Sequence, residues 1–177
     1  MNPDIGSALA EWHEFFATVA GVSGTLVGLL FVALGLNPAM MADTSPAGVR
    51  ILAAQTFHSL LVLLVLGIIG LVPDDDGQTL MITLIILGLT GLVRVALDLR
   101  QVRTDPDPRW RGRHAVLGAV SPALAYLTCL WLAFVIWQEN TEALGWFVAV
   151  VLLLTIDASS SCWDLLKHIG ERARTGA

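Results

Sequence analysis

The chain has 177 residues, of which 14% are charged and 55% are hydrophobic, and its formal net charge is −5 at pH 7. Soluble globular domains carry about 25% charged residues, so this composition excludes an ordinary soluble domain and indicates a protein that lies in a lipid bilayer. The sequence also contains no metal-ligand spacing, phosphate-binding glycine loop or nucleic-acid motif. We therefore expect no bound metal, no cofactor, no nucleic-acid partner and no enzymatic activity.

Five apolar stretches run along the chain, and each is long enough to cross a membrane, because about 20 apolar residues span the hydrocarbon core. Polar segments with prolines separate them, such as Asn37-Pro38 and the loop from Thr104 to Arg109. No lysine or arginine precedes the first stretch, so we expect a span there and not a signal peptide. The spans and their short loops use nearly the whole chain, which predicts one all-α, polytopic membrane domain over residues 1–177. The expected spans are residues 12–36, 48–72, 78–102, 113–137 and 142–166.

Positively charged residues indicate which way the chain lies, because the loops between spans alternate between the two sides of the membrane. Six of the ten lysines and arginines lie between Arg94 and Arg113, and the others also fall toward that side. Cytoplasmic loops carry the excess of positive charge, so we expect the N-terminus outside and the C-terminus in the cytoplasm. Arginine outnumbers lysine nine to one, which is typical of a GC-rich bacterial genome and favours a bacterial inner (plasma) membrane.

The opposite, outer side is acidic, and its densest cluster is Asp74, Asp75 and Asp76. Repeated around an oligomer, these carboxylates would concentrate cations at a pore mouth. The alternative, which we favour, is a solvated turn whose charge simply follows from the topology.

Polar residues inside the expected spans fall at similar depths. Counted at about 1.5 Å per residue from the outer ends, Arg94 on the third span and Asp157 on the fifth agree within about one turn. His58 on the second span, with Gln55 one turn deeper, and Ser121 on the fourth lie near the same level. Four helices therefore contribute polar groups to one layer, in which Arg94 and Asp157 are placed to pair.

Periodicity places these polar residues on single helix faces. Asp157, Ser161 and Asp164 share one face of the fifth span, and Arg94 and Asp98 share one face of the third. A charge at the centre of a helix in lipid costs ~2.5 to 3.5 kcal/mol, so a polar stripe must face protein or water, and we expect both stripes to point inward.

The polar layer has two interpretations. It is either a static Arg94–Asp157 ion pair with His58 and Ser121 as hydrogen-bonding partners, or a hydrated path for a proton or an inorganic cation. We favour conduction, and we expect a homo-oligomer because five helices rarely enclose a wide pore alone. The alternative function is a non-conducting accessory or scaffold subunit that binds a partner membrane protein. The residues of the expected transport layer are Gln55, His58, Arg94, Asp98, Ser121, Asp157, Ser161 and Asp164.

Small residues form a stripe on the first span, where Gly21, Gly24 and Gly28 include a GxxxG pattern. Such stripes let helix backbones approach closely, so we expect these glycines to pack against a helix of the same chain or, alternatively, of a second copy. The string Gly21-Val22-Ser23-Gly24 resembles the serine motif of rhomboid-type intramembrane proteases. It lies on the first span of a fold with one helix too few, so we do not expect a protease.

The histidines leave a second alternative, a haem b electron-transfer subunit, because five-span cytochromes hold haem between histidines of facing helices. His13 belongs to the outer side, and His58, His114 and His168 lie between the midplane and the inner surface. One bis-histidine site is compatible with this distribution, formed by His58 with His114 or His168. A lone intramembrane histidine is more often a hydrogen-bonded packing residue.

Overall fold

The computed structural model describes residues 5–36, 47–72, 77–104, 113–138, 140 and 144–175, and these ranges are helical apart from short turns. Five of the helices are long and apolar enough to cross a membrane, which confirms the expected all-α architecture and the expected number of spans. The helices are α1 (Ile5–Glu11), α2 (His13–Leu36), α3 (Ala47–Ile69), α4 (Gln78–Thr104), α5 (Arg113–Trp137) and α6 (Trp146–Thr175).

The helix boundaries differ from the expected ones in two places. The short helix α1 precedes the first span and is separated from α2 by a turn at Trp12, where the sequence suggested no separate element. Helix α6 begins at Trp146, later than the expected residue 142, and continues to Thr175. Pro122 lies inside α5 and has no backbone N–H, so the helix lacks one internal hydrogen bond at that point.

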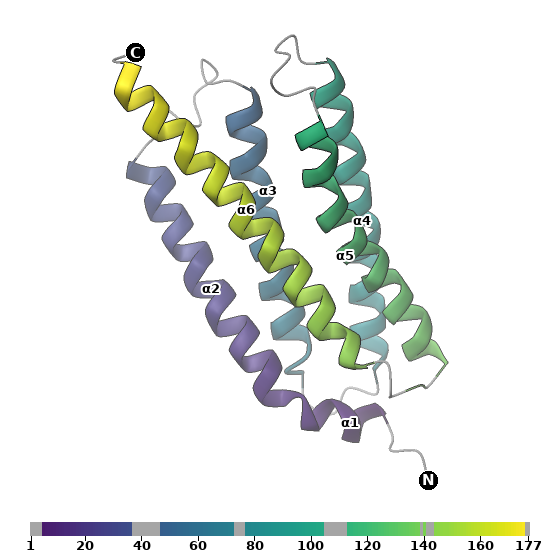
Figure 1. The fold of residues 1–177 in the computed structure, drawn as a ribbon. Helices are drawn as coiled ribbons and strands as arrows, with labels where there is room; N and C mark the ends of the chain where they lie inside the picture. The colour runs from purple at the N-terminus through teal and green to yellow at the C-terminus, as the bar shows by residue number, and fades with distance from the viewer. Residues whose placement is uncertain are drawn as a thin grey trace.

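Four of the helices form a ring, and the fifth lies outside it. Helix α4 packs along α5, α5 and α3 both pack against α6, and α3 closes the ring through a smaller contact with α4. Helix α2 packs on the outer side of α3. Figure 1 shows that the N- and C-termini lie at opposite ends of the bundle, as an odd number of spans requires.

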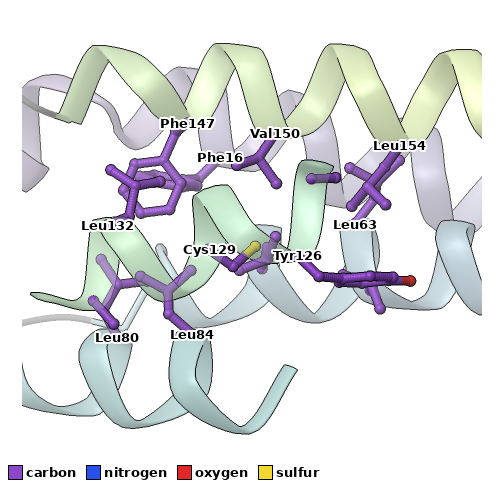
Figure 2. Close-up of a cluster of buried hydrophobic side chains, with 14 of the residues drawn as sticks. Phe16, Leu63, Leu80, Leu84, Tyr126, Cys129, Leu132, Phe147, Val150 and Leu154 are labelled. Carbon is purple, nitrogen blue, oxygen red and sulfur yellow. The ribbon is translucent and has the colours of Figure 1, made fainter. Parts of the chain in front are cut away.

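A dense apolar core fills the half of the ring nearest the N-terminus (Figure 2). The rings of Phe16 on α2 and Phe147 on α6 meet edge to face, with their centroids 5.4 Å apart. Such aromatic pairs add about 0.5–1.5 kcal/mol beyond the area they bury. Further side chains from α3 to α6 complete this apolar half, namely Leu63, Leu66, Leu80, Leu84, Cys129, Leu132, Val150 and Leu154.

Glycines set the closest approaches between neighbouring helices. A Cβ atom added to Gly67 on α3 would lie 2.6 Å from the backbone nitrogen of Ala20, so only glycine lets α2 come this near. On α4, a Cβ atom added to Gly88 would lie 2.7 Å from the side chain of Leu130 on α5. The α2–α3 and α4–α5 pairs are therefore held at short range by glycines that the sequence alone did not single out.

Candidate functional site

Asp157 on α6 is the centre of a buried hydrogen-bonded group, although it lies within a membrane-spanning helix. Its side chain is 2% exposed, and both of its carboxyl oxygens are bonded to α3. Gln55 donates from Nε2 to Oδ1 at 2.7 Å, and the Ser59 hydroxyl donates to Oδ2 at 2.6 Å. Gln55 and Ser59 are four residues apart and share one face of α3. We call Gln55, Ser59 and Asp157 the carboxyl cluster.

Arg94 on α4 does not pair with Asp157, which corrects the expected ion pair. Its Nη2 donates to the backbone carbonyl of Ala54 on α3 at 3.0 Å. Its Nε lies 4.0 Å from a carboxyl oxygen of Asp98, one turn along α4, and is buried without a hydrogen-bond partner. Equal depth did not produce the pair, because the carboxyl of Asp157 is already bonded to Gln55 and Ser59 of α3.

His58 and Tyr126 lie near both the carboxyl cluster and Arg94. The two rings are 6.1 Å apart and tilted by 52°, and His58 is also close enough to Arg94 to interact electrostatically with it. The Nε2 atom of His58 is buried and has no hydrogen-bond partner. Tyr126 is 1% exposed, and its hydroxyl lies beside Ser59. We call His58, Arg94 and Asp98 the arginine cluster.

Sequence reasoning missed Tyr126 as a member of this region. It is the only tyrosine of the chain, and it stands in the middle of an apolar span, where a phenolic hydroxyl needs a polar neighbour. That single polar aromatic residue was the available signal. The expected layer included Gln55 but not Ser59, although the four-residue spacing already placed both on one helix face.

The remaining residues of the expected layer have different environments. The Ser121 hydroxyl donates to the backbone carbonyl of Leu153 at 3.0 Å and so connects α5 to α6. Ser161 is buried, as an inward-facing stripe requires. Asp164 is exposed and accepts a hydrogen bond from Lys167 at 3.2 Å, so the expectation that it faces inward is wrong. Near the end of a span, a charged side chain can reach water without turning inward.

The glycine stripe of α2 faces away from the ring. A Cβ atom added to Gly21 or to Gly28 would meet no atom within 4 Å, and one added to Gly24 would make only ordinary contact with Leu64 at 3.5 Å. Gly21 and Gly28 are therefore not packed closely against another helix of the same chain. The buried Ser23 hydroxyl donates to the carbonyl of Val19 in its own helix, a bond that satisfies it locally.

Some predicted residues lie outside the part of the chain that the structure describes. These include the acidic cluster Asp74, Asp75 and Asp76 and the side chains of His114 and His168. The proposed bis-histidine haem site thus has only His58 in a described environment. Its ring lies against Tyr126 of α5.

Comparisons with known proteins add no assignment. Within the described ranges, no three histidine, cysteine, aspartate or glutamate side chains lie close enough together to hold a metal ion. The chain matches no protein-family model, no curated protein and no solved structure. The function therefore has to be inferred from the chemistry of the carboxyl cluster and the arginine cluster.

Proposed function

We propose that this chain is a multi-pass protein of the bacterial plasma membrane that transfers protons, with Asp157 as the group that carries them. Transfer of a small inorganic cation at the same group is the neighbouring alternative. The observation that carries the proposal is the environment of Asp157. Its carboxyl is buried within a span, and its hydrogen bonds come from an amide and a hydroxyl, neither of which is charged.

A carboxylate in this position is expensive unless something neutralises it. Placing an aspartate at the centre of a membrane helix costs ~2.5 to 3.5 kcal/mol even on the scale with the lowest values, which comes from membrane-insertion experiments. Buried charges are normally paired. Had Asp157 paired with Arg94, a static structural role would have been sufficient. With Arg94 bonded to Ala54 instead, a bound proton or cation supplies the neutralisation.

The partners of Asp157 suit a proton better than a metal cation. Gln55 donates to Oδ1 in both protonation states, whereas the Ser59 hydroxyl can donate to a carboxylate or accept from a protonated Oδ2. Gain or loss of the proton then requires only the rotation of one hydroxyl hydrogen. A calcium ion would need about six to eight oxygen ligands, many more than this cluster presents.

The two ends of the bundle give the site unequal access. Toward the N-terminal end, the apolar core of Figure 2 separates the carboxyl cluster from the membrane surface. Toward the other end, the side chains of Arg94 and Asp98 are 36% and 29% exposed. The positive-inside rule makes this second end cytoplasmic. The conformation described here thus exchanges protons with the cytoplasm, and complete transfer requires a second state in which the apolar half admits water.

Proton flux in liposomes tests the proposal. Purified protein is reconstituted with a pH-sensitive dye inside, and a voltage of either sign is applied in the presence of sodium, potassium or a bulky organic cation. We expect proton flux in the wild type and a loss of about 100-fold or more in Asp157→Asn, because the carrier group is gone. Asp164→Asn is the matched control on the same helix, and its flux should equal that of the wild type.

The outcomes separate the ions as well as the functions. No flux in the wild type under either sign of voltage would overturn the proposal. Flux that occurs with sodium or potassium but not with the bulky organic cation would mean that sodium or potassium, and not the proton, is the transferred ion. Equal losses in Asp157→Asn and Asp164→Asn would show that the effect is unspecific.

A second candidate function is supported by α2. This helix lies outside the ring, and its small-residue face, with Gly21 and Gly28, has open space before it. Such a face suits a helix of a second copy, which makes a homo-oligomer, or a helix of a partner protein, which makes the chain an accessory subunit. Gly21→Leu and Gly28→Leu should dissociate either assembly in mild detergent. A wild type that runs as a monomer without a stoichiometric partner would remove this candidate.

A further inference from the structure

We infer that Tyr126 is the hydroxyl link through which Asp157 exchanges its proton with His58, and that Gly91 is the position on α4 that allows the Tyr126 ring to lie there. The inference rests on the proposed function, because it names the route by which the carrier group is loaded. It concerns residues that are neither part of the carboxyl cluster nor charged.

Tyr126 connects the apolar half of the bundle to the polar half. It projects from α5 into the space between α3 and α4, and Figure 2 shows its hydroxyl pointing away from Leu80, Leu84 and Leu132. The hydroxyl lies beside Ser59, and Ser59 is bonded to Asp157. The ring itself lies against His58, so a single side chain is next to both polar clusters.

Gly91 determines where that ring lies. A Cβ atom added at Gly91 would overlap the Cδ1, Cε1 and Cγ atoms of the Tyr126 ring, so the ring rests directly on the backbone of α4. Gly88 lies one turn earlier on the same face and also approaches α5 closely. There an added Cβ atom would lie 2.7 Å from the Cγ and Cδ2 atoms of Leu130, which belong to a flexible side chain, and 3.1 Å from the backbone oxygen of Tyr126, but it would not meet the Tyr126 ring.

The proton transfer balances along this route. Asp157 gives its Oδ2 proton to the Ser59 oxygen, Ser59 gives its own hydroxyl proton to the Tyr126 oxygen, and Tyr126 gives its own to His58. Each hydroxyl ends with one proton, as it began, while Asp157 becomes a carboxylate and His58 an imidazolium. The acceptor is the Nε2 atom of His58, which is buried and without a hydrogen-bond partner, so the last transfer requires the His58 ring to turn until Nε2 meets the Tyr126 hydroxyl. The neighbouring Arg94 guanidinium repels the imidazolium, which favours onward release over storage of the charge.

The rate at which Asp157 exchanges its proton with solvent tests the link directly. The protein is moved into D2O, and the carboxylic C=O band of Asp157, identified by its loss in Asp157→Asn, is followed by infrared spectroscopy. Tyr126→Phe keeps the ring on Gly91 and removes only the hydroxyl, and we expect it to slow exchange by about ten-fold or more. Gly91→Ala, which displaces the ring, should slow exchange similarly.

Gly88→Ala is the matched control, because it perturbs the same helix contact without touching the ring. We expect its exchange rate to stay within about two-fold of the wild type, since Leu130 can move aside. Equal slowing in Gly88→Ala and Gly91→Ala would overturn the role of Gly91. Unchanged exchange in Tyr126→Phe, with the protein folded as judged by its melting temperature, would overturn the link.

Failure of the link is distinguishable from failure of the proposed function. Slowed exchange in Tyr126→Phe together with no proton flux in wild-type liposomes would support the link and overturn transport. Flux that needs Asp157 but not Tyr126 would retain transport and overturn the link. If the wild type shows no carboxylic band that disappears in Asp157→Asn, both the link and the proposed transport are overturned, because Asp157 would hold no proton to pass.

Discussion

The two halves of the bundle are held together by different kinds of interaction. The half near the N-terminus is joined by apolar side chains that fill space, with Phe16, Leu84 and Phe147 at its centre. The half near the C-terminus has a much smaller apolar cluster and is joined also by a few hydrogen bonds, above all those of Asp157. Apolar packing spreads its stabilisation over many contacts, whereas the proposed proton transfer depends on a few side chains of the polar half. Substitutions in the first half should therefore change stability, and those in the second should change proton exchange.

The largest effect on stability is expected at Leu84, which is fully buried in the apolar half. Leu84→Ala removes packed methyl groups and leaves a cavity, so the free energy of unfolding should fall by about 2–5 kcal/mol. Unfolding by denaturing detergent, followed by circular dichroism, measures it. Leu89→Ala, at an exposed position of the same helix, is the control and should lose much less. A loss of proton exchange at Asp157 in Leu84→Ala, at a temperature where it is folded, would contradict the separation of the two halves.

Two substitutions of Asp157 should differ from each other. Asp157→Ala leaves the half-buried Gln55 and the buried Ser59 without their acceptor, so stability should fall by about 1–3 kcal/mol. Asp157→Asn keeps an oxygen for Gln55 and an amide for the Ser59 oxygen, and should cost less than about 1 kcal/mol. Both should abolish proton flux. Equal destabilisation by the two would mean that the hydrogen bonds to α3 contribute little, and the same unfolding measurement decides this.

A smaller effect is expected at Arg94, which the structure separates from Asp157. Arg94→Met removes the hydrogen bond to Ala54 but keeps most of the side-chain length, so stability should fall by about 1 kcal/mol. The infrared band of Asp157 should stay at its wild-type position, whereas Ser59→Ala should move it. A shift of the band in Arg94→Met as large as in Ser59→Ala would indicate that Arg94 and Asp157 interact directly after all.

The smallest effect is expected at Asp164, whose side chain is exposed and is bonded along its own helix to Lys167. Exposed pairs of this kind contribute about 0–1 kcal/mol. Asp164→Asn should therefore leave both the free energy of unfolding and the proton exchange of Asp157 nearly unchanged. A clear loss of either would place Asp164 in the functional layer, as the sequence first suggested.

The sequence predicts the spans well and the side-chain partners poorly. Span length follows from the thickness of the bilayer, so five apolar helices could be read directly from composition, and counting along them brought Gln55, Ser121 and Asp157 to one level. Depth and periodicity do not fix how far each helix is rotated about its axis, nor which neighbour its face meets. For that reason Arg94 was paired with the wrong residue.

Local patterns mislead where the deciding factor is a neighbour. Gly21 and Gly28 belong to a stripe that contains a GxxxG, yet a Cβ atom added to either would meet nothing within 4 Å, whereas Gly67 and Gly91 stand in no such pattern and make close contacts. Whether a glycine is needed depends on what approaches it from another helix. Helix α1, with seven residues, is too short to give a periodic signal at all.

The hydrogen bond between Gln55 and Asp157 joins residues 102 positions apart, which constrains the order of events during synthesis. Membrane helices are made from the N-terminus onward, and the α2–α3 hairpin can pack as soon as both helices have been inserted. Gln55 and Ser59 must wait until α6, the last helix, reaches them. The polar cluster thus closes only after α6 has been made, so a product truncated before α6 would present two unsatisfied polar groups to the quality-control proteases of the membrane.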